Sequence, residues 1–145
     1  MGAAVLERRP AAIDLEAAAA DMPTIHARAL RRAVGVLREF YDPPAIFVFG
    51  SVVKGLAHAT SDVDLLMRIG PARRGHTRGH EFKEAMAGGF PHFDLIVFND
   101  EEIEHHFANP RSFLSSIMTT ARPLHVRDPE NEPLLRARAE RMKRL

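Results

Sequence analysis

Apolar residues recur along the chain at two different periods, and the periods predict an alternation of helices and strands. From Pro23 to Tyr41 the apolar positions follow helical spacing, so this segment predicts an amphipathic helix that ends before Pro43-Pro44. The unbroken apolar run 45–49 predicts a buried strand that stops at Gly50-Ser51. Strict alternation over 62–69 predicts a second strand with one apolar face.

The rest of the chain continues this alternation. A third strand is predicted at 92–98, closed by Asn99-Asp100, and a short strand at 124–126. Helices are predicted at 13–20, 52–56, 80–87, 111–121 and 134–145. This order predicts an α/β (α+β) fold with a small mixed β-sheet and flanking helices. We expect residues 1–22 to form a tail or short helix, 23–130 the domain, and 131–145 a basic amphipathic helix.

Composition narrows the classes of function. A chain of 145 residues fits one globular domain. Lys and Arg total 20 against 19 Asp and Glu, which leaves a net charge of +1 and disfavours direct binding of nucleic acid. The chain has no Cys, which excludes disulfides, cysteine-based zinc sites and thiol nucleophiles, and suits a reducing compartment.

The hydropathy pattern predicts no membrane segment. No stretch approaches the roughly 20 apolar residues of a membrane-spanning helix. Near the N-terminus, Asp14, Glu16 and Asp21 interrupt the apolar core that a secretory signal would need. We therefore expect a cytoplasmic protein.

The candidate chemistry begins where the first strand ends. Gly50-Ser51 joins that strand to the predicted helix at 52–56. Such a junction offers free backbone N–H groups, the positive end of a helix dipole and a hydroxyl, all suited to phosphate oxygens. Ten residues separate Ser51 from Asp62, and Asp64 follows on the same face of the second strand. Two carboxylates so placed can share or bridge divalent cations.

A third carboxylate completes the pattern if the strands are neighbours. Asp94 lies on the third predicted strand, and it joins Asp62 and Asp64 if that strand pairs with the second. Three carboxylates form an oxygen-rich set that Mg²⁺ accepts, with water and nucleotide phosphates as its other ligands. The cluster therefore suits two-metal phosphoryl or nucleotidyl transfer.

These residues resemble the minimal nucleotidyltransferases of the DNA polymerase beta superfamily. The match reads GSVVKGLAHATSDVDL, followed by FDLIV, and covers roughly residues 45–98. The spacing and small size are most similar to the MntA-like antitoxins of HEPN/MNT toxin–antitoxin pairs. The resemblance implies a polymerase-beta-type fold, two Mg²⁺ ions (with Mn²⁺ as a substitute) and ATP as substrate. It also implies transfer of AMP to a tyrosine of a partner HEPN RNase toxin encoded nearby.

Individual roles follow from the same resemblance. Gly50 and Ser51 are expected to hold the triphosphate, while Asp62, Asp64 and Asp94 bind metal and form the catalytic set, with Asp94 helping to deprotonate the acceptor hydroxyl. Relatives often have Arg directly after the Ser, whereas this chain has Val52 and its basic residue at Lys54. Lys54 is the candidate replacement for that nucleotide contact; a solvated Lys is the alternative.

Other interpretations stay open. The chain could mask a toxin without catalysis, or act on a small molecule as a homodimer, and its oligomeric state is undetermined. A protein acceptor is favoured because the chain after Asp94 leaves no room for a pocket-forming acceptor domain. The basic loop 73–80 could contact phosphate or a partner, and Glu104-His105-His106 is interpreted as a polar helix face because it lacks the H-E-x-x-H spacing.

Overall fold

The computed structural model describes residues 15–55, 61–70 and 79–143, and these contain six helices and four strands. The mixed α/β fold predicted from the sequence is confirmed. The elements in chain order are α2 (Leu15–Ala19), α3 (Thr24–Tyr41), β1 (Ala45–Phe49), β2 (Val63–Arg68), α4 (His80–Met86), β3 (Phe93–Phe98), α5 (Asp100–Phe107), α6 (Phe113–Ile117), β4 (Arg122–Val126) and α7 (Pro133–Lys143).

The four strands form one mixed sheet in the order β3-β2-β1-β4. β1 runs antiparallel to both β2 and β4, whereas β2 and β3 are parallel. The end of β1 therefore meets the starts of β2 and β3 at one edge of the sheet. The second and third strands are neighbours, which meets the condition stated above for Asp94, and Asp64 lies directly opposite Asp94 in the register.

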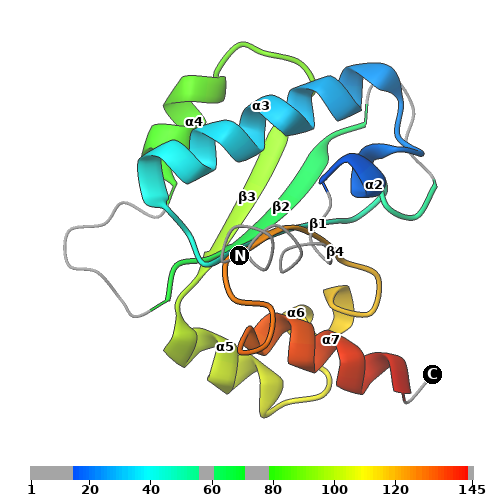
Figure 1. Ribbon diagram of the computed structural model, residues 1–145, viewed down its shortest axis with the longest axis vertical. Coiled ribbons are helices and arrows are strands. Elements are labelled where there is room, and N and C mark those ends of the chain that lie inside the picture. The colour runs from blue at the N-terminus through cyan, green and yellow to red at the C-terminus, as the bar shows by residue number, and fades with distance from the viewer. Residues whose placement is uncertain (1–14, 56–60, 71–78, 144–145) are drawn as a thin grey trace, which may run out of the picture.

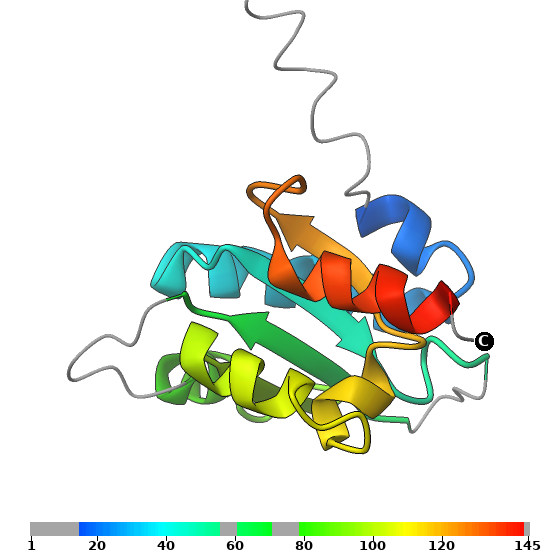
Figure 2. The same cartoon turned by 90° about the horizontal axis from the view of Figure 1, so that it is seen from below.

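Helices cover both faces of the sheet, as Figure 1 shows, with α3 and α4 on one side and α5, α6 and α7 on the other. Alternation along β2 explains the two layers. Val63, Leu65 and Met67 belong to the core beneath α3, while Leu66 belongs to the second core with Phe47 and other residues. Figure 2 shows the second layer from below, with α5 and α7 lying across the sheet.

Helix α3 is the longest element and follows the predicted apolar stripe. Leu30, Val34 and Leu37 are buried, and Tyr41 ends the helix with its hydroxyl accepting a hydrogen bond from the Phe82 N–H at 3.0 Å. Asp42 adopts a left-handed conformation and its N–H donates to the Arg38 carbonyl, which closes the last turn. The helix is thereby fixed at the level of α4.

Helix α5 adds to the sequence analysis, which interpreted Glu104-His105-His106 as a polar helix face but gave no bounds for a helix after Asn99-Asp100. The Asn99 side chain accepts from the Glu102 N–H at 2.9 Å, and the Glu102 carboxylate accepts from the Asn99 N–H at 3.0 Å. This reciprocal capping box was readable as Asn-x-x-Glu in the sequence. Ile103 is the buried anchor of the helix.

The helix predicted at 52–56 was wrong for its described part. Residues 51–55 form turns between Gly50 and Gly55, both with positive φ, and Leu56 lies outside the described residues. Val52 and Val53 are drawn into the core, and so short a segment cannot offset the cost of helix nucleation. The phosphate-binding argument from a helix dipole therefore fails; only turn amides and the Ser51 hydroxyl remain.

Two predicted boundaries also moved. The helix predicted at 111–121 contracts to α6, which begins after Ser112, whose hydroxyl accepts from the Ser115 N–H. The strand predicted at 124–126 begins earlier, at Arg122, because Arg122 already pairs with Val48 of β1. The other predicted strands and the helix at 80–87 agree with the structure to within two residues at either end.

Helix α7 packs onto the domain through its first turn. Leu134 is completely buried in the second core, and Glu132, just before the helix, is also buried. Glu132 accepts two hydrogen bonds from the Arg68 guanidinium at 2.9 Å and one from the Leu134 N–H at 3.1 Å. Among the helices described here, none is long and apolar enough to cross a bilayer.

Candidate active site

The junction of β1 and β2 brings Gly50 against Asp64. Phe49 lies opposite Asp64 in the antiparallel register, so Gly50 follows at the level of the aspartate. A Cβ at Gly50 would lie 2.2 Å from Asp64 Oδ2, and Gly50 has a φ of +84°. Only glycine permits both this backbone conformation and this approach, so the Gly50-Ser51 turn lies directly beside the carboxylate.

The three aspartates gather at the same edge of the sheet. Asp64 and Asp94 occupy matching positions on the parallel strands β2 and β3, so their side chains project from the same face. Asp62 stands just before β2 and is exposed. Asp62 and Asp94 also line one cavity of about 400 Å³ beside the end of α4. The structure thus brings together the three carboxylates that the sequence singled out.

Electrostatics at the cluster are unfavourable in the absence of a cation. Partial burial raises the pKa of the Asp64 carboxyl, and the nearby charges of Asp94 and Asp62 raise it further. A side-chain hydrogen bond to Asp94 acts in the same direction. The carboxylates therefore repel one another, and a divalent cation would relieve that repulsion.

A metal ion at this cluster would need ligands besides the aspartates. Within the described residues, no group of three acidic, histidine or cysteine side chains is placed so that it could hold a metal ion by itself. The aspartates are close without enclosing an ion. Mg²⁺ suits such a set, because it takes oxygen ligands and completes its octahedron with water and substrate phosphates.

The predicted nucleotide-binding residues Ser51 and Lys54 lie in the turn that follows Gly50. Ser51 is half-buried in the turn next to Gly50, where its carbonyl accepts from the Lys54 N–H at 3.2 Å. Lys54 is exposed one turn further on. In the described part of the chain, neither side chain pairs with an aspartate. Ser51 therefore adjoins the cluster through its neighbour Gly50, whereas Lys54 is a solvent-facing cation of the same turn.

His26 is a residue that sequence reasoning left unassigned. It lies on α3, is completely buried, and its Nε2 donates to the Ser61 carbonyl at 2.8 Å. Its Nδ1 is buried with no hydrogen-bond partner among the described residues. Because Ser61 precedes Asp62, this bond fixes the entry to β2. No motif signals a bond that spans 35 positions.

Of the two further sequence candidates, the Glu104-His105-His106 group lies on α5 and is not part of the site. His106 packs edge-on against Phe98 with ring centroids 4.9 Å apart, and Glu104 and His105 are exposed on α5, in agreement with a polar helix face. The basic loop candidate extends over 73–80, of which residues 73–78 lie outside the described residues.

Comparison with known families agrees with this arrangement. A family model described as the nucleotidyltransferase domain matches residues 30–144, most of the chain. The chain belongs to the nucleotidyltransferase family. The matched region includes Gly50 and all three aspartates of the site, together with every strand of the sheet.

Two solved structures are similar to this chain at low sequence identity, and the likeness to the first shows a shared fold. A crystal structure of a toxin–antitoxin with AMP-PNP is 16% identical, covers 79% of this chain and 86% of its own, and has a TM-score of 0.54. A candidate nucleotidyltransferase from Sulfolobus solfataricus is also 16% identical, with coverages of 78% and 87% and a TM-score of 0.45. No curated protein sequence matches.

Proposed function

We propose that this chain is a Mg²⁺-dependent nucleotidyltransferase that moves AMP from ATP onto a hydroxyl of a partner protein and releases pyrophosphate. The observation that carries the proposal is the convergence of Gly50 with Asp64, and of Asp64 with Asp94, at one edge of the sheet. Family membership supports the nucleotidyl transfer itself. The metal, the nucleotide and the acceptor belong to the proposal.

Each residue of the site has a separate role in the proposed reaction. Asp62, Asp64 and Asp94 would hold two Mg²⁺ ions, or Mn²⁺ in their place, and the metal supplies neutralisation of phosphate charge. The turn at Gly50 lets the triphosphate approach the backbone, and Ser51 donates a hydrogen bond to a phosphate oxygen. Lys54 adds a positive charge near the outer phosphates. Asp94 accepts the proton of the acceptor hydroxyl as the oxygen attacks the α-phosphate.

We propose a protein toxin as the acceptor, with a tyrosine of a HEPN-type RNase as the target and neutralisation of the toxin as the result. Support comes from a structural neighbour that is a toxin–antitoxin crystallised with AMP-PNP. The described residues form one small sheet with flanking helices and contain no separate acceptor-binding domain, which favours a protein acceptor that brings its own surface to the site. All three aspartates are present, which favours catalysis over masking of the toxin without catalysis.

The deciding experiment uses labelled ATP, Mg²⁺, the full chain and the product of the adjacent gene. Intact-mass analysis should show one or more AMP additions on the neighbour's protein. The Asp62→Ala, Asp64→Ala double variant should add none and still fold, because both positions lie at the edge of the sheet. Inhibition of the neighbour that persists without modification in this variant would favour masking instead.

The metal requirement has a separate measurement. Isothermal titration should show that Mg²⁺ or Mn²⁺ tightens ATP binding to the wild-type chain and has no such effect on the double variant. Equally tight ATP binding in EDTA would refute the assignment of metal to the aspartates.

Transfer of AMP to a free sugar or drug by a homodimer would identify a small-molecule enzyme.

A further inference from the structure

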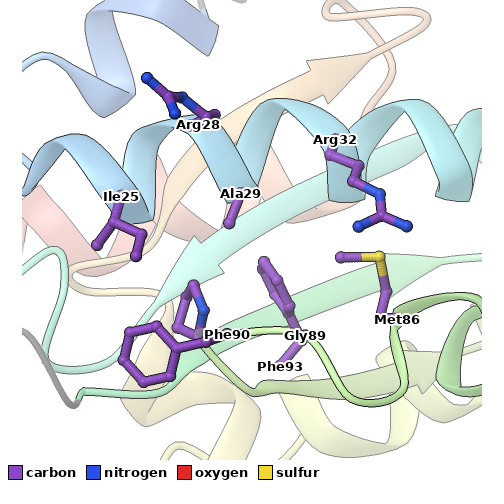
Figure 3. A pocket seen from close by; sticks show the side chains of 9 residues that line it. Ile25, Arg28, Ala29, Arg32, Met86, Gly89, Phe90 and Phe93 are labelled. Atoms are coloured by element: carbon purple, nitrogen blue, oxygen red, sulfur yellow. The ribbon is translucent and has the colours of Figure 1, made fainter.

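A groove runs between α3 and the segment that leads into β3, and its surface is unusually apolar for an exposed region. It encloses a cavity of about 200 Å³. Figure 3 shows Ala29, Phe93 and Met86 along it, with Ile25 and Phe90 together at one end. Ile25 is 46% exposed and Phe90 is 47% exposed, two of the four exposed large apolar side chains in the described residues. Such a concentration marks a surface that binds something.

Two arginines on α3 border this groove with positive charge. Arg28 and Arg32 are four residues apart and therefore neighbours on the helix surface. Arg32 extends toward Met86 (Figure 3), and its only hydrogen bond within the described residues is a long one, 3.5 Å, to the Ala85 carbonyl. Neither arginine has a carboxylate partner in the described part of the chain. By contrast, Arg31 between them is paired with Glu16 at 2.6 Å.

The groove adjoins the aspartate cleft. Met86 and Phe93 line both the groove and the cavity that contains Asp62 and Asp94. A molecule seated in the groove therefore lies next to the reacting centre. An acceptor protein needs this kind of placement, because its hydroxyl must be held in line with the bond that breaks.

We propose that this groove docks an amphipathic helix of the acceptor protein, with apolar side chains between Ile25 and Phe93 and carboxylates against Arg28 and Arg32. The inference rests on the proposed function in taking the acceptor to be a protein. It adds where that protein binds and what chemistry its binding segment carries. Burial of a few apolar side chains supplies affinity, and the charge pairs set orientation and partner choice.

Other occupants fit the groove less well. Nucleic acid is disfavoured, because the net charge is +1 and the groove is largely apolar. A second copy of this chain could offer its acidic helix α5, but the apolar anchor of that helix, Ile103, is 2% exposed and committed to its own core. Helix α5 of a second copy therefore offers the groove no free apolar anchor, which favours a helix of a different protein.

The first test measures AMP transfer to the adjacent gene's product as a function of its concentration. Arg28→Glu with Arg32→Glu should raise KM for the protein acceptor at least tenfold, and Ile25→Ser should raise it severalfold. Binding of a non-hydrolysable ATP analogue should stay unchanged in both. The controls are Arg38→Glu and Phe40→Ser, which reverse one charge and remove one exposed apolar side chain on α3 outside the groove; Phe40 is 52% exposed. Phe90 is left intact because its ring contacts His26.

The second test needs no partner and no catalysis. Fluorescence anisotropy compares two labelled 18-residue helical peptides with identical Leu anchors, one with flanking Glu and the other with Lys. The Glu peptide should bind the wild-type chain at least tenfold more tightly than the Lys peptide and weaken with salt. The double Arg→Glu variant should reverse that preference.

The outcomes separate the docking site from the proposed function. Transfer by the wild-type chain with equal KM in groove and control variants would overturn the docking site and leave the enzyme proposal standing. If nothing is transferred, the peptide preference and its reversal decide the docking site alone. Equal binding of both peptides, tighter binding of a single-stranded RNA probe, or a homodimer that the Arg28→Glu, Arg32→Glu variant dissociates would each refute it.

Discussion

The charged side chain at one end of β2 is paired with opposite charges, whereas those at the other end lie near like charges. At its far end, Arg68 donates to the buried Glu132 and forms an ion pair with Asp100 at 2.6 Å. Burial opposes the charge of Arg68, but the two carboxylates outweigh it and raise the pKa of the guanidinium. At the near end, Asp62 and Asp64 face Asp94, and the pKa of Asp64 is raised by burial and by its like-charged neighbours.

This difference separates charges that are satisfied by a partner within the protein from charges that are not. Arg68 and Glu132 satisfy each other inside the protein, and the pair attaches α7 to the sheet. The aspartates have no such cation within the described residues. A cluster that repels itself is retained at a cost in stability, which a bound cation and nucleotide would offset. Four perturbations test the contrast.

The largest effect is expected from Arg68→Met. It leaves Glu132, 1% exposed, with a buried charge and no cation. Chemical denaturation should show a loss of about 3–5 kcal/mol in the free energy of unfolding. Arg31→Met, which breaks an exposed pair with Glu16, serves as control and should leave the free energy of unfolding almost unchanged, because solvent screens that pair. Equal losses in the two variants would mean that burial does not distinguish these pairs.

Gly50→Ala tests the end of β2 at which the aspartates cluster. The new Cβ would meet Asp64 Oδ2 at 2.2 Å and would occupy a left-handed backbone conformation. We expect a loss of about 1–3 kcal/mol in stability together with weaker metal-dependent ATP binding. Gly55→Ala has a similar positive φ but no atom of the described residues within 4 Å of the new Cβ, so it should lose stability and retain ATP binding. Intact ATP binding in Gly50→Ala would remove Gly50 from the site.

His26→Leu tests how the near end is positioned. Losing the bond from Nε2 to the Ser61 carbonyl should cost about 0.5–1.5 kcal/mol of stability. It should also weaken Mn²⁺ binding, measured by electron paramagnetic resonance, because Asp62 follows Ser61. His26→Gln, which retains a donor, should restore part of the Mn²⁺ affinity. A His26→Leu variant with wild-type Mn²⁺ affinity would make the bond purely structural.

The smallest effect has the opposite sign. In metal-free protein, Asp64→Asn should raise the free energy of unfolding at pH 7 by roughly 0.2–1 kcal/mol, because it removes like-charge repulsion. The pKa of Asp64 in the folded state lies above its ordinary value of 3.8. At pH values between the ordinary and the raised pKa, the folded state binds more protons than the unfolded state, so wild-type stability falls as pH rises. The advantage of Asp64→Asn should therefore shrink as pH falls toward 4. An advantage that grows instead would contradict the raised pKa.

Local patterns in the sequence determined most of the elements and part of the site. The alternation over 62–69 showed both the strand and the shared face of Asp62 and Asp64, because strand side chains repeat every two residues. The stripe of α3 predicted its buried face. The missing bounds of α5 and the mistaken helix after Ser51 were local errors, one an overlooked capping box and the other a segment whose valines joined the core.

Only the tertiary structure determined which residues of different helices and strands are neighbours. The sequence established the carboxylates and Gly50, but only the strand order set Asp94 opposite Asp64 and Gly50 against its Oδ2. The His26 bond, the Arg68–Glu132 pair and the groove between α3 and β3 join residues far apart in the chain. A sequence pattern reports periodicity within one element. Contacts between elements depend on how their faces pack, and that packing is settled by burial of the whole core.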